Sequence, residues 1–234
     1  MNLLDLIVIL VLMLYVLYGY YRGFFHSVLS IGAYILSWGA GMLFFNAVGT
    51  LIKGNESIYN TMLYYTEGSE YIGNVELTKT PVSQINLDQL GDLIAKSTLP
   101  HPMGEQVKVN VSTEAFSDLG ITTLGDYFNQ TIVCVFINII AFLLIFAAVR
   151  LILGLIINSA DHAGVFPALR HSDSLIGAGF GALRGVLALF LLMMLTPIAL
   201  TILPFDFIRE QLDSSFFAPF FYHSNFLLSL IPGV

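Results

Sequence analysis

The chain has 234 residues, of which 56% are hydrophobic and only 11% are charged, and its mean hydropathy is +0.81. A soluble domain carries about 25% charged residues, so this composition excludes an ordinary soluble protein and predicts an integral membrane protein. The formal net charge is −7 and no basic face is visible, which argues against nucleic-acid binding. The single cysteine excludes an intrachain disulfide and a cysteine-rich metal site.

The first part of the chain, 1–48, is typical of two membrane helices. The apolar run 3–18 ends in a group of tyrosines, which gather where a helix leaves the hydrocarbon layer, and Arg22 follows. A second apolar run covers 24–48. Because no basic residue precedes Asp5 and no small-residue cleavage site follows, the sequence favours a retained membrane helix over a secretory signal. We therefore expect a first transmembrane hairpin here.

The segment 49–130 has a different composition. All four lysines and ten of the sixteen acidic residues lie in 46–130, so nearly all of the net charge is there. Apolar residues at helical spacing predict a short amphipathic helix over 87–96, and alternating valines give a strand signal over 106–111. We expect a small, mainly helical, water-exposed insert that rests partly on the membrane domain.

Two further apolar runs follow the insert. The run 131–157 contains the polar Asn138, and the run 185–203 has no charged residue. Each is long enough to cross a hydrocarbon layer ~30 Å thick at ~1.5 Å per helical residue. They predict a second transmembrane hairpin over 131–203, with a polar connector at 158–174.

The C-terminal residues 204–234 are rich in phenylalanine and begin with charged residues. This segment is too polar at its start to span a membrane, so it is interpreted as one or two amphipathic helices at the interface. The predicted fold is therefore an all-α integral membrane protein. It has four transmembrane helices in two hairpins, a mainly helical insert and an amphipathic tail.

The arginines predict the orientation in the membrane. Four of the five lie in short connectors or near helix ends on one side: Arg22, Arg150, Arg170 and Arg184. Because such basic segments stay in the cytoplasm, both hairpin turns and the connector are expected there. The N-terminus, the insert and the tail are then extracytoplasmic. The lysines of the insert do not oppose this, since long loops translocate largely regardless of charge.

A Gly-x-x-Arg-Gly pattern occurs twice, at 19–23 and 181–185, each time before an apolar run, and each hairpin is expected to turn at its arginine. In the simpler interpretation, Arg22 and Arg184 lie at the interface and extend toward lipid phosphates. In the alternative, they meet and bind an anion or an acidic partner. Inserting an arginine at the centre of a bilayer costs roughly 2.5–3.5 kcal/mol, and a bound negative charge would offset part of that cost. That alternative suits a small transporter or channel subunit for anionic or amphipathic solutes.

Gly177, Gly181 and Gly185 are spaced four residues apart and share one helix face. Small residues at this spacing permit close helix packing, within the chain or between protomers. A phosphate-binding loop is disfavoured because no strand precedes these glycines. We expect the protein to contact the lipid bilayer and to associate with itself or with other membrane proteins.

Few other residues suggest chemistry. Asp5 is placed to interact with the N-terminal dipole of the first helix, with a proton relay as the alternative. Asn138 is expected to form an interhelical hydrogen bond, and His26 to lie at the interface. Four polar residues of the connector could hold a metal but lack a tight ligand pattern: Asp161, His162, His171 and Asp173. With no GxSxG and no cofactor motif, we expect neither catalysis nor a metal or cofactor.

Several motifs of this sequence occur together in one known family. They are Asp5, then Arg22-Gly23-Phe24, and a later block of Pro167-Ala168-Leu169, Asp173, Leu175-Ile176-Gly177, Gly179-Phe180-Gly181 and Ala182-Leu183-Arg184-Gly185-Val186-Leu187. With these motifs the chain resembles the colicin V production (CvpA) family of bacterial cytoplasmic-membrane proteins. The resemblance covers 1–48 and 131–203 and leaves the insert and the tail outside. It implies four membrane helices, no enzymatic activity, and a part in toxin production or export and in envelope homeostasis.

Overall fold

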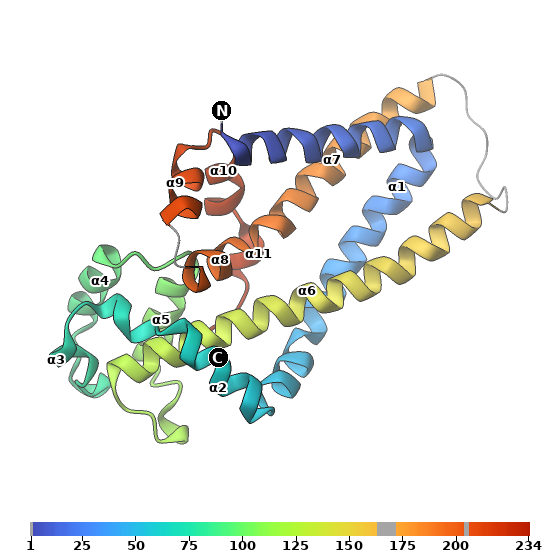
Figure 1. Ribbon diagram of the computed structural model, residues 1–234. Helices are drawn as coiled ribbons and strands as arrows, with labels where there is room; N and C mark the ends of the chain where they lie inside the picture. Colours follow the sequence, from blue (N-terminus) through green and yellow to red (C-terminus); the bar gives the residue numbers. More distant parts are fainter. Residues whose placement is uncertain (1, 163–171, 204–205) are drawn as a thin grey trace. The chain divides into compact units, whose positions relative to one another are not determined.

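The computed structural model describes residues 2–162, 172–203 and 206–234, and all regular elements in these ranges are helices (Figure 1). The α-helices are α1 (Leu3–Lys53), α2 (Glu56–Thr66), α3 (Val75–Thr78), α4 (Leu87–Lys96), α5 (Met103–Ser112), α6 (Leu124–His162), α7 (Ser172–Met193), α8 (Thr196–Ile202), α9 (Asp206–Ser214), α10 (Ala218–His223) and α11 (Phe226–Ser229). Short 3-10 helices cover Gly68–Ile72, Val82–Gln84 and Ser117–Leu119. The predicted all-α class is confirmed.

Three helices in the described part of the chain are long and apolar enough to cross a membrane: Leu3–Lys53, Leu124–His162 and Asp173–Ile202. The first is not a single straight helix. Gly23 interrupts α1 with φ +76° and ψ −175°, a conformation that glycine adopts without a steric penalty. The ribbon of α1 changes direction there, so the helix consists of a first arm before Gly23 and a second arm after it (Figure 1).

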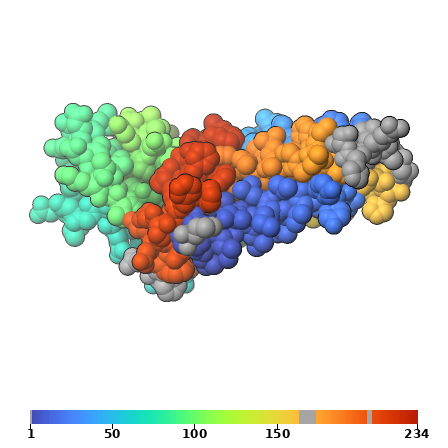
Figure 2. Space-filling model, turned by 90° about the horizontal axis from the view of Figure 1, so that it is seen from above, coloured from blue at the N-terminus to red at the C-terminus, as the bar shows by residue number. Residues whose placement is uncertain are grey.

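The first of two compact units contains Met1–Phe45, Ala141–Met194 and Asp206–Asn225. It therefore holds most of α1, the later part of α6, all of α7, and the short helices α9 and α10. The first arm of α1 and α7 lie side by side, blue against orange in the space-filling view (Figure 2). This unit contains Arg22, Arg150 and Arg184 and the glycine ladder singled out in the sequence.

The second unit contains Asn46–Ile140, Leu195–Phe205 and Phe226–Val234. Three of its short helices, α2, α3 and α4, begin after asparagines, whose side chains accept hydrogen bonds from otherwise unpaired backbone N–H groups of the first turn. A buried apolar cluster joins α4, α5 and the beginning of α6, and its members are Ile72, Val82, Leu90, Val107, Val111, Phe116, Leu124, Tyr127, Phe128 and Cys134. The mainly helical insert is thus organised around its own core.

The two local predictions for the insert have different outcomes. The helix over 87–96 is confirmed as α4, which begins after the cap at Asn86 and buries Leu90. The strand over 106–111 is wrong, since those residues belong to α5. Val107 and Val111 are one helical turn apart and both are buried, whereas Val109 is exposed. The alternating pattern was therefore part of an i, i+4 helical face.

The predicted division at 48, 130 and 203 stays a prediction, because it follows membrane topology rather than packing. By contacts, the tail is shared, with α9 and α10 in the first unit and α11 in the second. The tail is helical, while its place at the membrane interface stays a prediction. Most of the connector 158–174, including Pro167, Arg170 and His171, lies outside the described residues.

Candidate functional site

The glycine ladder brings α7 close to the first arm of α1, with backbone against backbone at Gly177 and Gly181. A Cβ added to Gly181 would lie 2.3 Å from the backbone oxygen of Tyr15, and one on Gly177 would lie 2.4 Å from that of Gly19. A Cβ on Gly185 would reach the side chain of Leu12 at 3.1 Å. In the structure the glycine face thus packs within the chain, against the first arm of α1. Self-association itself stays a prediction and would need another surface.

The same close approach buries Arg184 among tyrosines of α1. Its side chain is 3% exposed, and its guanidinium carbon lies 4.9 Å from the ring centre of Tyr15 and 4.8 Å from that of Tyr18. Its Nε is buried without a hydrogen-bond partner. Among the described residues, no carboxylate forms an ion pair with Arg184. The expectation of a turn at this arginine is wrong, because Arg184 lies inside the continuous helix α7.

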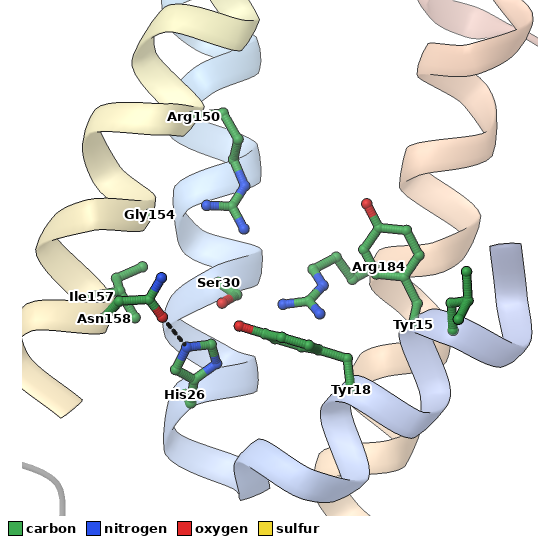
Figure 3. Close-up of a pocket in the computed structure, with 10 residues that line it drawn as sticks. Tyr15, Tyr18, His26, Ser30, Arg150, Gly154, Ile157, Asn158 and Arg184 are labelled. Carbon is green, nitrogen blue, oxygen red and sulfur yellow. Dashed lines mark hydrogen bonds between the residues drawn. The ribbon is translucent and has the colours of Figure 1, made fainter. Parts of the chain in front are cut away.

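A cavity of about 320 Å³ opens beside this guanidinium. Its lining comes from α1, α6 and α7: Leu14, Tyr15, Tyr18, His26, Ser30, Arg150, Gly154, Ile157, Asn158 and Arg184. Figure 3 shows the guanidinium groups of Arg150 and Arg184 pointing from different helices into the space between them. Arg150 also lies over the ring of Tyr34 at 4.8 Å, and the hydroxyls of Tyr34 and Tyr15 share a hydrogen bond of 2.7 Å.

His26 forms part of the wall of this cavity and is buried rather than exposed at a surface. Its Nε2 shares a hydrogen bond of 3.2 Å with Oδ1 of Asn158, drawn as the dashed line in Figure 3. Its Nδ1 is buried and has no partner, and the same holds for the hydroxyl of the adjacent Ser27. Two side chains that line the cavity, His26 and Arg184, thus each have a buried nitrogen without a hydrogen-bond partner.

Arg22, by contrast, has a counter-ion. Its guanidinium nitrogen lies 2.6 Å from Oδ2 of Asp161, in a pair whose side chains are 33% and 29% exposed. Arg22 also lies over the ring of Tyr18, 5.5 Å from the ring centre, but it does not line the cavity. Arg22 and Arg184 therefore share a tyrosine rather than a ligand site, and the arginine that joins Arg184 at the cavity is Arg150.

The break at Gly23 is closed by the other acidic residue of this region. The second arm of α1 begins with a backbone N–H at Phe24, which donates to Oδ1 of Asp173 at 2.7 Å. Such a carboxylate satisfies a helix N-terminus and interacts favourably with its dipole. A Cβ on Gly23 would lie 2.4 Å from Oδ2 of Asp173. Glycine is thus required here both by φ and by space.

The comparison with known families agrees with the motifs that form these contacts. The family model for the colicin V production protein matches residues 4–68 and 117–225. The chain belongs to the colicin V production (CvpA) family. No curated protein and no solved structure matches it. Membership and the three long apolar helices make this a membrane protein of the CvpA family, a family not known for enzymatic activity.

The family match is wider than the resemblance predicted. The insert and the tail were expected to lie outside it, but the match includes 49–68, 117–130 and 204–225. The unmatched residues are 1–3, the middle of the insert at 69–116, and those after 225. Every lining residue of the cavity lies in the matched part of this CvpA chain.

Asp5 of this CvpA protein lies in the first unit but away from the cavity lining. It is fully buried, and its Oδ1 accepts hydrogen bonds from the hydroxyl of Ser215 at 2.7 Å and from the N–H groups of Phe216 and Phe217 at 2.9 and 3.0 Å. Its Oδ2 accepts one from the backbone N–H of Asn2 at 3.0 Å. The carboxylate therefore holds the turn between α9 and α10 against the beginning of α1.

Asn138 lies in the second unit, apart from the other candidates. Its amide Nδ2 donates to the backbone oxygens of Pro232 and Val234 at 2.9 and 3.0 Å. The sequence predicted an interhelical hydrogen bond for Asn138. Its partner is instead the C-terminal segment. Its Oδ1 is buried without a partner, and a Cβ on Gly49 would lie 3.0 Å from it.

Three of the four residues considered as metal ligands have other partners in the structure. Asp161 and Asp173 form the contacts at the helix break described above, and Nδ1 of His162 shares a hydrogen bond of 2.8 Å with the backbone oxygen of Asn158. His171 lies outside the described residues. Within the described ranges, no group of three histidine, cysteine or acidic side chains is placed to bind a metal.

Sequence reasoning missed Arg150 as a site residue. The available signal was a charged residue inside an otherwise apolar run, which is by itself a functional indication in a membrane helix. The tyrosines Tyr15 and Tyr18 were assigned to an interfacial belt, whereas their rings lie against Arg184.

Proposed function

We propose that this protein is a four-span, non-enzymatic protein of the bacterial cytoplasmic membrane that supports toxin production or export and envelope homeostasis. The observation that carries the proposal is the family match, which covers all of the described apolar helices but not the middle of the insert. The proposed role is one of binding and support within the membrane.

Helix lengths support four spans. At ~1.5 Å per residue, the 51 residues of α1 would measure about 75 Å, far more than a hydrocarbon layer of ~30 Å. The break at Gly23 divides this length into two arms, each long enough to cross once. Together with Leu124–His162 and Asp173–Ile202 they supply two helical hairpins. In the first, the turn is at Gly23, and in the second it falls in the connector 158–174.

Cysteine accessibility in intact cells tests this topology. Cys134 is buried and is replaced by alanine to give a cysteine-free background. In that background, Leu119→Cys in the insert should react with an impermeant maleimide from outside, and Tyr21→Cys beside the first turn should react only after lysis, since both positions are exposed. Leu43→Cys, on an apolar surface of the second arm, is the control and should stay unreactive. The reverse pattern for the first two would contradict the orientation.

Complementation tests the biological role. A colicin V-producing strain that lacks its own family member should export the toxin again when this chain is expressed, and regain resistance to envelope stress. Toxin activity in the medium and inside cells separates export from synthesis. Normal export in the deletion strain, with no change on complementation, would reject the role.

A second candidate function is that of a small transporter or channel subunit for anionic or amphipathic solutes. It is favoured by Arg184, a buried cation that borders a cavity without an acidic partner in the described residues. Arg22, the other arginine first proposed for this role, supports it less because Asp161 neutralises it. Flux of an organic anion into proteoliposomes, lost in Arg184→Gln and kept in Arg22→Gln, would support transport. Absence of flux with the unaltered protein would end it.

A further inference from the structure

We propose that the cavity between α1, α6 and α7 binds a phosphate group, supplied either by the headgroup of a membrane lipid or by free phosphate. The inference rests on the proposed membrane arrangement, because it depends on the cavity lying at membrane depth. It goes beyond that function by assigning a ligand class and naming the residues that hold it.

The first support is the charge of the lining. Two guanidinium groups, from Arg150 and Arg184, point into the cavity, and the lining includes no carboxylate (Figure 3). Both arginines lie in helices that are apolar enough to span a membrane. Cations at that depth need a partner, since the surrounding hydrocarbon offers neither water nor counter-ions. An anion in the cavity supplies one partner to both.

The second support is the unused hydrogen-bonding capacity of Arg184. Its side chain is more than nine-tenths buried, and its Nε has no hydrogen-bond partner. The tyrosine rings on either side stabilise the charge but accept no conventional N–H hydrogen bond on their faces. Buried donors of this kind are rare in native proteins and are usually satisfied by a ligand or by water.

The third support is a comparison within the chain. Arg22 occupies the same position as Arg184 in the other copy of the Gly-x-x-Arg-Gly motif, but it does not line the cavity. It is paired with Asp161 at 2.6 Å. The chain therefore provides an acid for the arginine that does not line the cavity and none, in its described residues, for the two that do. Asp161 and Asp173, the two acids at the helix break, are both engaged there.

The remaining lining groups fit a phosphate. A guanidinium presents a planar fork of donors that matches phosphate oxygens, and two forks from different helices can bind different oxygens of one group. The hydroxyl of Ser30 and the ring of His26 add polar groups at the same wall. Basic pockets between transmembrane helices are a recurrent type of site for lipid headgroups.

The size and the apolar part of the lining also matter. About 320 Å³ is at the small end of ligand pockets, which suits a headgroup or a free anion rather than a whole lipid. Leu14 and Ile157 add apolar surface beside the charged groups. This mixture is suited to the boundary between a phosphate and the first carbons of its ester.

The test is a binding measurement on the purified full chain in detergent. Native mass spectrometry and thermal shift are recorded with three probes: dioctanoyl phosphatidic acid, inorganic phosphate, and dioctanoylglycerol, which has the same chains and no phosphate. We expect saturable binding of the phosphatidic acid and no saturable binding of the neutral lipid. If inorganic phosphate competes with similar strength, the source is free phosphate; if only the lipid binds, the source is a headgroup.

Variants locate the binding. Arg184→Gln and Arg150→Gln should each weaken it by about tenfold to a hundredfold, the range for losing a hydrogen bond to a charged group. Arg184→Lys should weaken binding less than Arg184→Gln does, because lysine keeps the positive charge but lacks the planar pair of guanidinium donors. Arg209→Gln removes the same charge from α9, outside the cavity, and should change binding by less than about twofold. Size-exclusion profiles identify any variant that fails to fold.

Two results would overturn the inference. One is equal binding of the phosphatidic acid and the neutral lipid by the unaltered protein, which needs no variant to interpret. The other is an equal effect of Arg209→Gln and of the cavity variants. The chain could also bind the phosphatidic acid but fail to restore toxin export. That result would support the inference about phosphate and reject the proposed role in toxin export, so the two proposals can be distinguished.

Discussion

Replacing Gly181 by alanine should destabilise the first unit, although alanine is the better helix former. A Cβ at this position would lie 2.3 Å from the backbone oxygen of Tyr15, whereas ordinary contact begins at 3.4 Å. The first arm of α1 and α7 must therefore separate by about 1.1 Å to restore ordinary contact, and neither contacting group is a flexible side-chain end. Overpacking of this kind costs about 1–3 kcal/mol, against a gain of about 0.5–1 kcal/mol from helix propensity.

Gly179 provides the matched control on the same helix. A Cβ there would meet nothing within 4 Å, so Gly179→Ala should show only the gain in propensity. The difference between the two variants should reach about 2 kcal/mol in the free energy of unfolding. Reversible unfolding by denaturant in detergent micelles measures it. Equal stability of Gly181→Ala and Gly179→Ala would refute the tight contact and, with it, the reason given for the burial of Arg184.

Three further changes test the remaining contacts. Asp5→Ala removes the acceptor of three donors in the turn before α10, so we expect a loss of about 3 kcal/mol and early proteolytic cleavage of the tail; an unchanged cleavage rate would contradict this. A double-mutant cycle on Arg22 and Asp161 should give a coupling below about 1 kcal/mol, because both side chains are about one-third exposed; a larger coupling would show a drier environment. Asn110→Ala should cost about 1–3 kcal/mol in thermal unfolding, since its amide donates to two buried oxygens, and no cost would exclude these bonds.

Helices with a strong local signal could be predicted from the sequence, and those with a weak one could not. The segment 87–96 has apolar residues at helical spacing and an asparagine directly before it, and the structure has a helix with these bounds. In α5, valines at every second position imitate a strand. Met103, Val107 and Val111 are also spaced four apart, and burial against the cluster of the second unit decides for the helix. Periodicity over so few residues permits both patterns.

The site was less predictable than the helices because its contacts join distant parts of the chain. Asp5 and Ser215 are 210 residues apart, and Arg22 and Asp161 are 139 apart. A single sequence gives no information about such pairs. Hydropathy places Arg150 in an apolar helix. Whether its side chain points toward the cavity depends on how α6 is rotated about its axis relative to α1 and α7, and only packing determines that rotation.

The two copies of the Gly-x-x-Arg-Gly motif have different structural roles in this protein. In the first copy, Gly23 takes a positive φ and ends a helical arm, and this places Arg22 near Asp161. In the second copy, Gly185 stays helical, since α7 continues to Met193. Its missing side chain serves close packing against Leu12 instead.

Packing of one copy against the other explains the difference. Gly177 and Gly181 leave room for the backbone of the first arm, so the arginine that follows them is enclosed by Tyr15 and Tyr18 and cannot extend to the surface. The first copy lies at a chain reversal, where an acid from the end of α6 can reach its arginine. The unneutralised charge at the cavity is thus a consequence of the glycine ladder. Separating the ladder in Gly181→Ala should therefore weaken phosphate binding as well as stability, whereas Gly179→Ala should affect neither adversely.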